Sequence, residues 1–137
     1  MNYYWRLFAT GFCFLIFGIG GVILRFFVFP ILSCFPGGVI QKQRRARLCI
    51  HFSFFLFLEL MRRTGVLTYD FDGLEKLNKS GQLIIANHPT LIDVILLVSR
   101  VPLANCIVKQ ELWNNPIMKG AVVNTGYISN GDSEKMI

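Results

Sequence analysis

Residues 83–93 read LIIANHPTLID, a short apolar run that passes through a polar loop into a helix-like segment. The run 83–86 follows the turn-forming Lys79-Ser80-Gly81 and is typical of a strand. Pro89 favours a helix that begins at once, because its missing N–H would be unpaired in a first helical turn anyway. The stretch therefore predicts a strand that delivers His88 to the start of a helix.

The spacing of His88 and Asp93 is the chemically informative part of this stretch. On one regular helix the two side chains would diverge by about 140°, at about 3.6 residues per turn, so they meet only if His88 precedes the helix. Asp93 would then accept the Nδ1–H of His88 and leave Nε2 as a general base. The alternative is structural, because Thr90-Leu91-Ile92-Asp93 also fits a capping box that only satisfies backbone donors.

The flanking sequence alternates between strand-like and helix-like segments. Strands are predicted over 66–71, 83–86, 106–108 and 127–129, and helices over 90–99 and 110–119. This alternation predicts an α/β architecture with some parallel strand pairing. We expect two parts: hydrophobic membrane-associated helices over 1–64, and the N-terminal part of an α/β domain over 65–137.

The N-terminal part is apolar enough for a membrane. Residues 7–24 contain no charged side chain, and at about 1.5 Å per residue they reach about 27 Å, close to the thickness of a bilayer core. Pro30 and the Pro36-Gly37-Gly38 turn predict that 26–40 does not continue the same helix. The uncharged run 48–58 is too short to span and predicts an interfacial or re-entrant helix. A cleaved signal peptide is disfavoured by the weakly basic start and by the lack of a small-residue cleavage site.

Positive charge is concentrated in the same part of the chain. Residues 1–69 hold eight of the 14 Lys and Arg residues, but only one of the eight acids and 12 of the 13 Phe. The basic stretch 42–47 (Lys42, Arg44, Arg45 and Arg47) is typical of a segment at an anionic cytoplasmic leaflet. A basic and apolar segment favours membrane lipids as partners, with no nucleic acid, and places the following residues on the cytoplasmic side.

The remaining reactive side chains are assigned no chemistry. Cys13, Cys34, Cys49 and Cys106 form no CxxC pair, and cysteines in apolar surroundings behave as small hydrophobes, so neither a metal site nor a disulfide framework is expected. His51 lies in the apolar run 48–58 and is interpreted as an interfacial or packed histidine.

NHPTLID, residues 87–93, resembles the H-x-x-x-x-D signature of the lysophospholipid (1-acylglycerol-3-phosphate) O-acyltransferase family, over about residues 65–131. Lys109-Gln110-Glu111-Leu112, Pro116, Gly120 and Gly126 resemble that family's K-x-E-L, P-x-x-x-G and G-x-I segments. Hydrophobic helices before the domain are also a feature of that family.

The resemblance implies transfer of a fatty acyl group from acyl-CoA or acyl-carrier protein to a hydroxyl of a lysophospholipid-like acceptor, in membrane lipid biosynthesis. His88 and Asp93 would be catalytic, with no metal and no bound cofactor. It implies substrate-binding positions at Asn87, Lys109, Gly126, Tyr127, Ser129 and Asn130. The alternative is a non-catalytic membrane-docking fragment or interaction module.

The chain departs from the family pattern in two places. Asn130 stands where the family has an arginine for the acceptor phosphate, which predicts a preference for an acceptor with an uncharged headgroup. Lys109 is either a phosphate contact or an ordinary solvated lysine. The family's E-G-T-R-like block would follow Ile137, so the resemblance also predicts a domain that is truncated before its C-terminal blocks.

Overall fold

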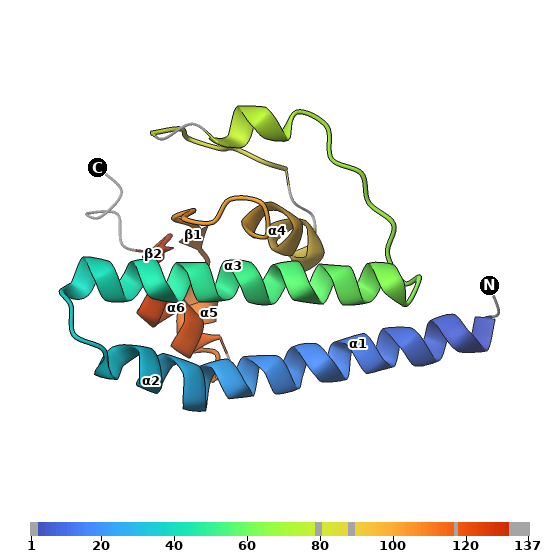
Figure 1. Cartoon of the computed structure of the whole chain (residues 1–137), viewed down its shortest axis with the longest axis horizontal. Coiled ribbons are helices and arrows are strands. Elements are labelled where there is room, and N and C mark those ends of the chain that lie inside the picture. Colours follow the sequence, from blue (N-terminus) through green and yellow to red (C-terminus); the bar gives the residue numbers. More distant parts are fainter. Residues whose placement is uncertain (1–2, 79–80, 88–89, 117, 132–137) are drawn as a thin grey trace.

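The computed structural model describes residues 3–78, 81–87, 90–116 and 118–131, and it is mainly helical. The elements in chain order are α1 (Tyr3–Ile23), the π-helical turn η1 (Leu24–Val28), α2 (Phe29–Cys34), α3 (Val39–Arg63), the 3-10 helix η2 (Leu74–Asn78), α4 (Leu91–Val98), β1 (Ile107–Val108), α5 (Gln110–Asn114), α6 (Lys119–Thr125) and β2 (Ile128–Ser129). In Figure 1, α1 and α2 run beside α3, and the C-terminal elements lie around α3.

The first helix is longer than the sequence suggested. The segment Tyr3–Cys34 forms 32 residues of helix, long and apolar enough to cross a membrane by length and composition. The sequence predicted that residues 26–40 do not continue this helix. Residues 26–34 do continue it, so the prediction was wrong for this part. Pro30 lies in the first turn of α2, directly after η1, and a π-turn accommodates an interruption of the hydrogen-bond ladder without ending the helix. The helix does end before the Pro36-Gly37-Gly38 turn.

Helix α3 is also longer than predicted, since it includes both the basic stretch 42–47 and the apolar run 48–58 within 25 residues. Arg, Lys, Gln and Ala are strong helix formers, so the basic stretch extends the helix toward its start after Gly38. The interfacial helix expected over 48–58 is therefore the middle of a much longer one.

Contacts at both ends hold α1 and α2 against α3. Near the start of α1, the Trp5 indole Nε1–H donates to the Thr64 carbonyl at 3.2 Å, and the Cys13 sulfur lies 3.8 Å from the Thr64 hydroxyl. At the other end, Phe29 is buried in a cluster with Ala46 and Ile50 of α3. The helical segment Tyr3–Cys34 thus lies against α3 along most of its length.

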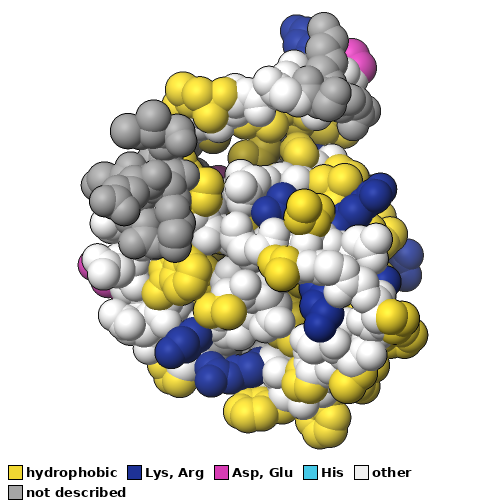
Figure 2. Space-filling model, turned by 90° about the vertical axis from the view of Figure 1, so that its left-hand side faces the viewer, with side chains coloured by type: hydrophobic (Ala, Val, Ile, Leu, Met, Phe, Trp, Pro, Cys, Tyr) yellow, Lys and Arg dark blue, Asp and Glu magenta, His cyan; other side chains and the backbone are white. Residues whose placement is uncertain are grey.

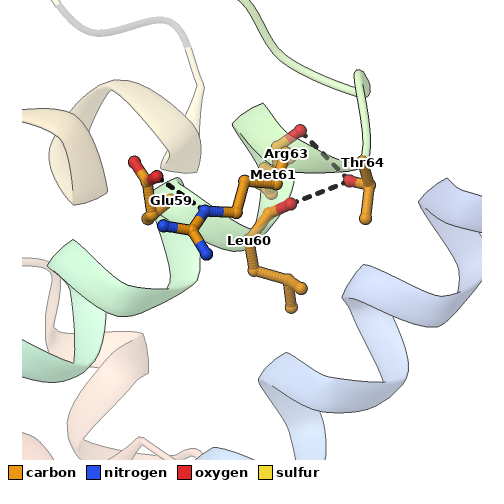
Figure 3. A network of polar contacts seen from close by, with 5 residues as sticks. All are labelled: Glu59, Leu60, Met61, Arg63 and Thr64. Atoms are coloured by element: carbon orange, nitrogen blue, oxygen red, sulfur yellow. Dashed lines mark hydrogen bonds and ion pairs between the residues drawn. The ribbon is translucent and has the colours of Figure 1, made fainter.

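The C-terminal end of α3 closes with local hydrogen bonds (Figure 3). Arg63 Nε donates to Glu59 Oε1 at 2.8 Å, and the Thr64 hydroxyl contacts the carbonyl oxygens of Leu60 at 2.9 Å and Met61 at 3.1 Å. Gly65 follows with a φ of 73°, the left-handed conformation that often ends helices. The boundary expected between residues 64 and 65 thus coincides with the end of a helix.

The predicted strands are confirmed at two places and wrong at two. β1 and β2 pair in parallel, with Ile107 opposite Ile128, as predicted for 106–108 and 127–129. Residues 66–71 and 83–86 form no strand. β-Branched and apolar residues favour a strand only when a neighbouring strand pairs with it and buries one face, whereas Leu83 and Ile85 are 81% and 87% exposed.

The predicted helices of the C-terminal part are present with altered bounds. α4 confirms the helix expected over 90–99. The helix expected over 110–119 is divided, because α5 ends at Asn114 and α6 begins at Lys119. Asn115 is extended, with a ψ of 123°, the conformation that a following Pro116 imposes. With strands limited to one pair in the described part of the chain, the α/β class stays a prediction.

Candidate functional site

Asp93 is anchored in the first turn of α4. Its Oδ2 accepts the backbone N–H of Thr90 at 3.0 Å and the Thr90 hydroxyl at 2.6 Å. Thr90 is the extended N-cap residue, and the two residues form the capping box that the sequence predicted. These are not the only interactions of Asp93. A carboxylate has about four lone-pair sites, so the capping contacts occupy only part of its acceptor capacity.

The partner proposed for Asp93 lies outside the described residues. His88 and Pro89 belong to the part of the chain that the structure leaves undescribed, so the pairing of His88 with Asp93 stays a prediction. Asn87, the residue before them, is exposed and lies in an irregular segment.

The structure brings Lys109 and Asn130 together at the ends of the two parallel strands. Each directly follows its strand, and Val108 is paired with Ser129. The Asn130 N–H donates to the Val108 carbonyl at 3.0 Å, which extends the ladder by one bond. Lys109 is exposed at this edge. The carboxyl ends of parallel strands are the usual location of ligand sites in α/β proteins.

The side chain of Asn130 also has a structural partner. Its Oδ1 accepts the backbone N–H of Gln110, the first residue of α5, at 3.0 Å. Ser129 is only 6% exposed, and its Oγ accepts the N–H of Gly131 at 3.2 Å. The headgroup contacts predicted for Ser129 and Asn130 would therefore compete with bonds that stabilise the chain itself.

Gly126 and Tyr127 lie where α6 turns into β2. Gly126 ends α6 with a φ of 66°, a conformation that favours glycine, and a side chain there would displace the amide end of Gln43 of α3. Tyr127 is partly buried beside Cys106, and burial raises the pKa of its phenol above the ordinary value. Burial also raises the pKa of the Cys106 thiol. Burial thus disfavours the ionised form of both groups.

Some side chains of the basic stretch 42–47 are exposed to solvent, and others form hydrogen bonds within the protein. Arg47 Nε donates to the Thr125 carbonyl at 2.8 Å, and its guanidinium also contacts Asn105 Oδ1 at 3.3 Å. Arg45 donates to the Pro36 carbonyl at 3.0 Å. Lys42 and Arg44 are exposed. Residues at these spacings point to different sides of a helix, so only part of the stretch faces outward.

The sequence analysis interpreted His51 as an interfacial or packed residue and overlooked Arg100. His51 is half-buried, and its Nδ1 lies 3.0 Å from the Val98 carbonyl. Because a carbonyl oxygen only accepts, Nδ1 carries the proton, and this half-buried, backbone-bonded ring agrees with the interpretation of His51 as an interfacial or packed histidine. Arg100 lies among three aromatic rings. In the sequence Arg100 is a single cation after an apolar helix, a pattern that is also typical of an ordinary residue at a helix C-terminus. The sequence therefore did not distinguish it.

Among the described residues, no three His, Cys, Asp or Glu side chains form a group that could hold a metal ion. Comparisons of the chain with protein families, with curated proteins and with solved structures found no match.

Proposed function

We propose that the chain belongs to a membrane-bound O-acyltransferase that transfers a fatty acyl group from acyl-CoA or acyl-carrier protein to a hydroxyl of a lysophospholipid-like acceptor. The observation that carries the proposal is the capping box, which holds the Asp93 carboxylate in the first turn of α4, five residues after His88. A carboxylate fixed at that point is suited to orient an imidazole that precedes the helix.

In the proposed reaction His88 accepts the proton of the acceptor hydroxyl on Nε2. The acceptor oxygen attacks the thioester carbonyl carbon, and the carbon–sulfur bond breaks. The departing thiolate receives the proton from His88, so the side chain returns to its starting state. Asp93 accepts the Nδ1–H and stabilises the positive imidazolium between these steps. No serine or cysteine nucleophile is required.

The N-terminal helices support a lipid acceptor. Tyr3–Cys34 is apolar enough to enter a bilayer, and many of its large side chains are exposed, among them Phe8, Phe14, Phe26 and Phe27 at 63–73%. At the lower side of Figure 2, where α2 lies, hydrophobic side chains are exposed with Lys and Arg side chains near them. An acceptor whose acyl chain stays in the bilayer would present its headgroup beside such a surface.

The charges at the start of α3 support the cytoplasmic side for the C-terminal part. Lys42 and Arg44 are exposed, and exposed basic residues next to an apolar helix favour the cytoplasmic leaflet. The C-terminal elements pack on the same helix, because Arg47 of α3 bonds to Thr125 at the end of α6. They would therefore lie on that side as well.

The test is an acyl-transfer assay with the chain reconstituted in phospholipid vesicles, with radiolabelled acyl-CoA or acyl-carrier protein and a lysophospholipid. The variants are His88→Ala and Asp93→Asn, and Thr90→Val is a milder variant, since it removes the hydroxyl bond that holds Asp93 but no reacting group. We expect transfer by the wild type, reduced transfer by Thr90→Val, and loss of transfer in His88→Ala. If the wild-type chain bound vesicles but transferred no acyl group, the enzyme proposal would be wrong, and the alternative of a non-catalytic membrane-docking module would take its place.

A further inference from the structure

A hollow lies beside the C-terminal end of α4, away from the proposed acyl-transfer site. Its volume is about 320 Å³, and it is lined by His51 and Phe55 of α3, Leu74 of η2, and the loop residues Ser99, Arg100 and Pro102. Asp93 is at the opposite end of α4, seven residues from Arg100, or about 10 Å along the helix axis. Figure 1 shows the chain between α3 and η2 passing above α4.

Arg100 is held in place by aromatic rings. Its guanidinium carbon lies 4.4 Å from the ring centre of Phe71, 5.5 Å from that of Phe55 and 5.8 Å from that of Tyr69. Stacking on rings uses the face of the guanidinium and leaves the N–H groups in its plane available. Its buried Nε has no hydrogen-bond partner among the described residues. The cation is therefore positioned by contacts that do not consume its donors.

The charges around this end of α3 favour an anion. Glu59 is the acid in electrostatic contact with Arg100, and it is already bonded to Arg63 at 2.8 Å. That hydrogen bond, with the charges of Arg62, Arg63 and Arg100, holds the pKa of the Glu59 carboxyl below its usual range. Three arginines thus surround the Glu59 carboxyl, and Arg100 is the one that lines the hollow, while the acids of the covering segment, Asp70, Asp72 and Glu75, are exposed to solvent.

The other polar groups of the hollow are already oriented. The His51 Nδ1–H donates to the Val98 carbonyl, and the Ser99 hydroxyl donates to the Leu96 carbonyl at 2.7 Å. These bonds fix the imidazole ring and leave the Ser99 oxygen as an acceptor. Arg100 is therefore the main donor available to a ligand in the hollow.

The rim of the hollow continues into an exposed apolar surface. Phe55, which lines the hollow, is 39% exposed, and its neighbours Phe52 and Leu56 on α3 are 59% and 66% exposed. A ligand with a charged head and an apolar tail would match both regions at once. A small polar anion would use the cation alone.

Arg100 in the hollow thus lies beside an exposed apolar surface of α3. From this arrangement we propose that the hollow binds the phosphate group of an anionic phospholipid, with the acyl chains lying against Phe52, Phe55 and Leu56. The planar guanidinium of Arg100 supplies paired donors that match phosphate oxygens. This site is independent of the acyl-transfer proposal, because it uses neither His88 nor Asp93. It would anchor the C-terminal elements to a membrane that contains acidic lipid.

The test measures the thermal stability of the detergent-solubilised chain during titration with dihexanoyl phosphatidate. Dihexanoylglycerol, which lacks the phosphate, and inorganic phosphate, which lacks the chains, are the comparison ligands. A ligand that binds the folded state raises Tm as its concentration increases. We expect phosphatidate to raise Tm in the wild type and in the exposed control Arg44→Gln, and to bind Arg100→Gln at least tenfold more weakly.

Because Arg100→Gln also removes three ring contacts, a second measurement uses the folded wild type. In ¹⁵N NMR spectra the Nε–H signal of Arg100, assigned by its loss in Arg100→Lys, should shift on addition of phosphatidate but not of dihexanoylglycerol. An unshifted signal, or equal binding of dihexanoylglycerol and phosphatidate, would overturn the site. Inorganic phosphate that binds as tightly as phosphatidate would overturn the lipid assignment in favour of a free-anion site.

Discussion

Thr90 and Asp93 hold each other at the start of α4: the Asp93 carboxylate accepts both the backbone N–H and the hydroxyl of Thr90, at 3.0 and 2.6 Å. The same carboxylate is the one proposed to orient His88. The capping role of Asp93 is observed and its positioning role is a proposal, and substitution of Asp93 tests the second role.

Asp93→Asn should reduce acyl transfer far more than it reduces stability. The amide keeps an acceptor for Thr90, so we expect a loss of about 1 kcal/mol of unfolding free energy, whereas loss of the charge that is proposed to orient His88 should lower kcat by about 10²–10⁴. The measurements are urea unfolding and initial rates in vesicles. Unchanged kcat with a comparable loss of stability would leave only the capping role.

Asn130→Ala should destabilise the chain, because it removes the acceptor for the first N–H of α5. The expected loss is about 1 kcal/mol, as for other N-terminal helix contacts. Asn130→Asp is the matched variant, since it keeps the acceptor and adds a charge that a helix N-terminus favours. If both variants unfolded at the same urea concentration as the wild type, the Gln110 contact would contribute nothing.

Asn130→Arg tests the prediction about the acceptor. A guanidinium at this edge of the strands would form charge-assisted bonds to a phosphomonoester. We expect the ratio of kcat/KM for lysophosphatidic acid to that for a lysolipid with an uncharged headgroup to rise by the equivalent of about 1.5–3 kcal/mol. An unchanged ratio would identify Asn130 as an ordinary loop residue.

Arg47→Met and Arg44→Met should behave differently although the two residues lie in the same basic stretch. Arg47 donates to the Thr125 carbonyl at 2.8 Å and links α3 to α6, and loss of a hydrogen bond from a charged group costs about 1.5–3 kcal/mol. Arg44 is exposed, so its replacement should change the unfolding free energy by less than about 0.5 kcal/mol. Equal effects of the two substitutions in urea unfolding would contradict the link between the helices.

Stability should fall in alkaline solution because of Cys106 and Tyr127. Both have a pKa raised in the folded state, chiefly by burial, so the folded chain holds these protons more tightly than the unfolded chain does. Their contribution is complete below the unfolded pKa values, about 8.5 for Cys and 10 for Tyr, and is lost as pH rises above them. Unfolding midpoints from pH 7 to about pH 11 check this, with Tyr127→Phe as the variant whose decline should be smaller.

Much of the secondary structure is readable from the sequence because its causes are local. The uncharged stretch 7–24 forms helix, the Thr90 and Asp93 pattern forms the cap of α4, and Gly65 ends α3 with a positive φ. The strands expected at 106–108 and 127–129 are present as Ile107–Val108 and Ile128–Ser129, although their parallel pairing is not a local contact. Charge, helix capping and the conformational freedom of glycine act within a few residues.

Tertiary contacts decided the rest. The apolar run 83–86 has the composition of a strand but no neighbouring strand among the residues that the structure describes, and composition cannot supply one. Arg47 and Arg44 look equivalent in the sequence, yet only the packing of α6 on α3 gives Arg47 the Thr125 carbonyl as a partner. Arg100 becomes a candidate anion-binding residue only when Phe55, Tyr69 and Phe71, which are far from it in the sequence, surround its guanidinium. A side chain's role depends on which groups desolvate it and bond to it, and those groups are brought together by folding.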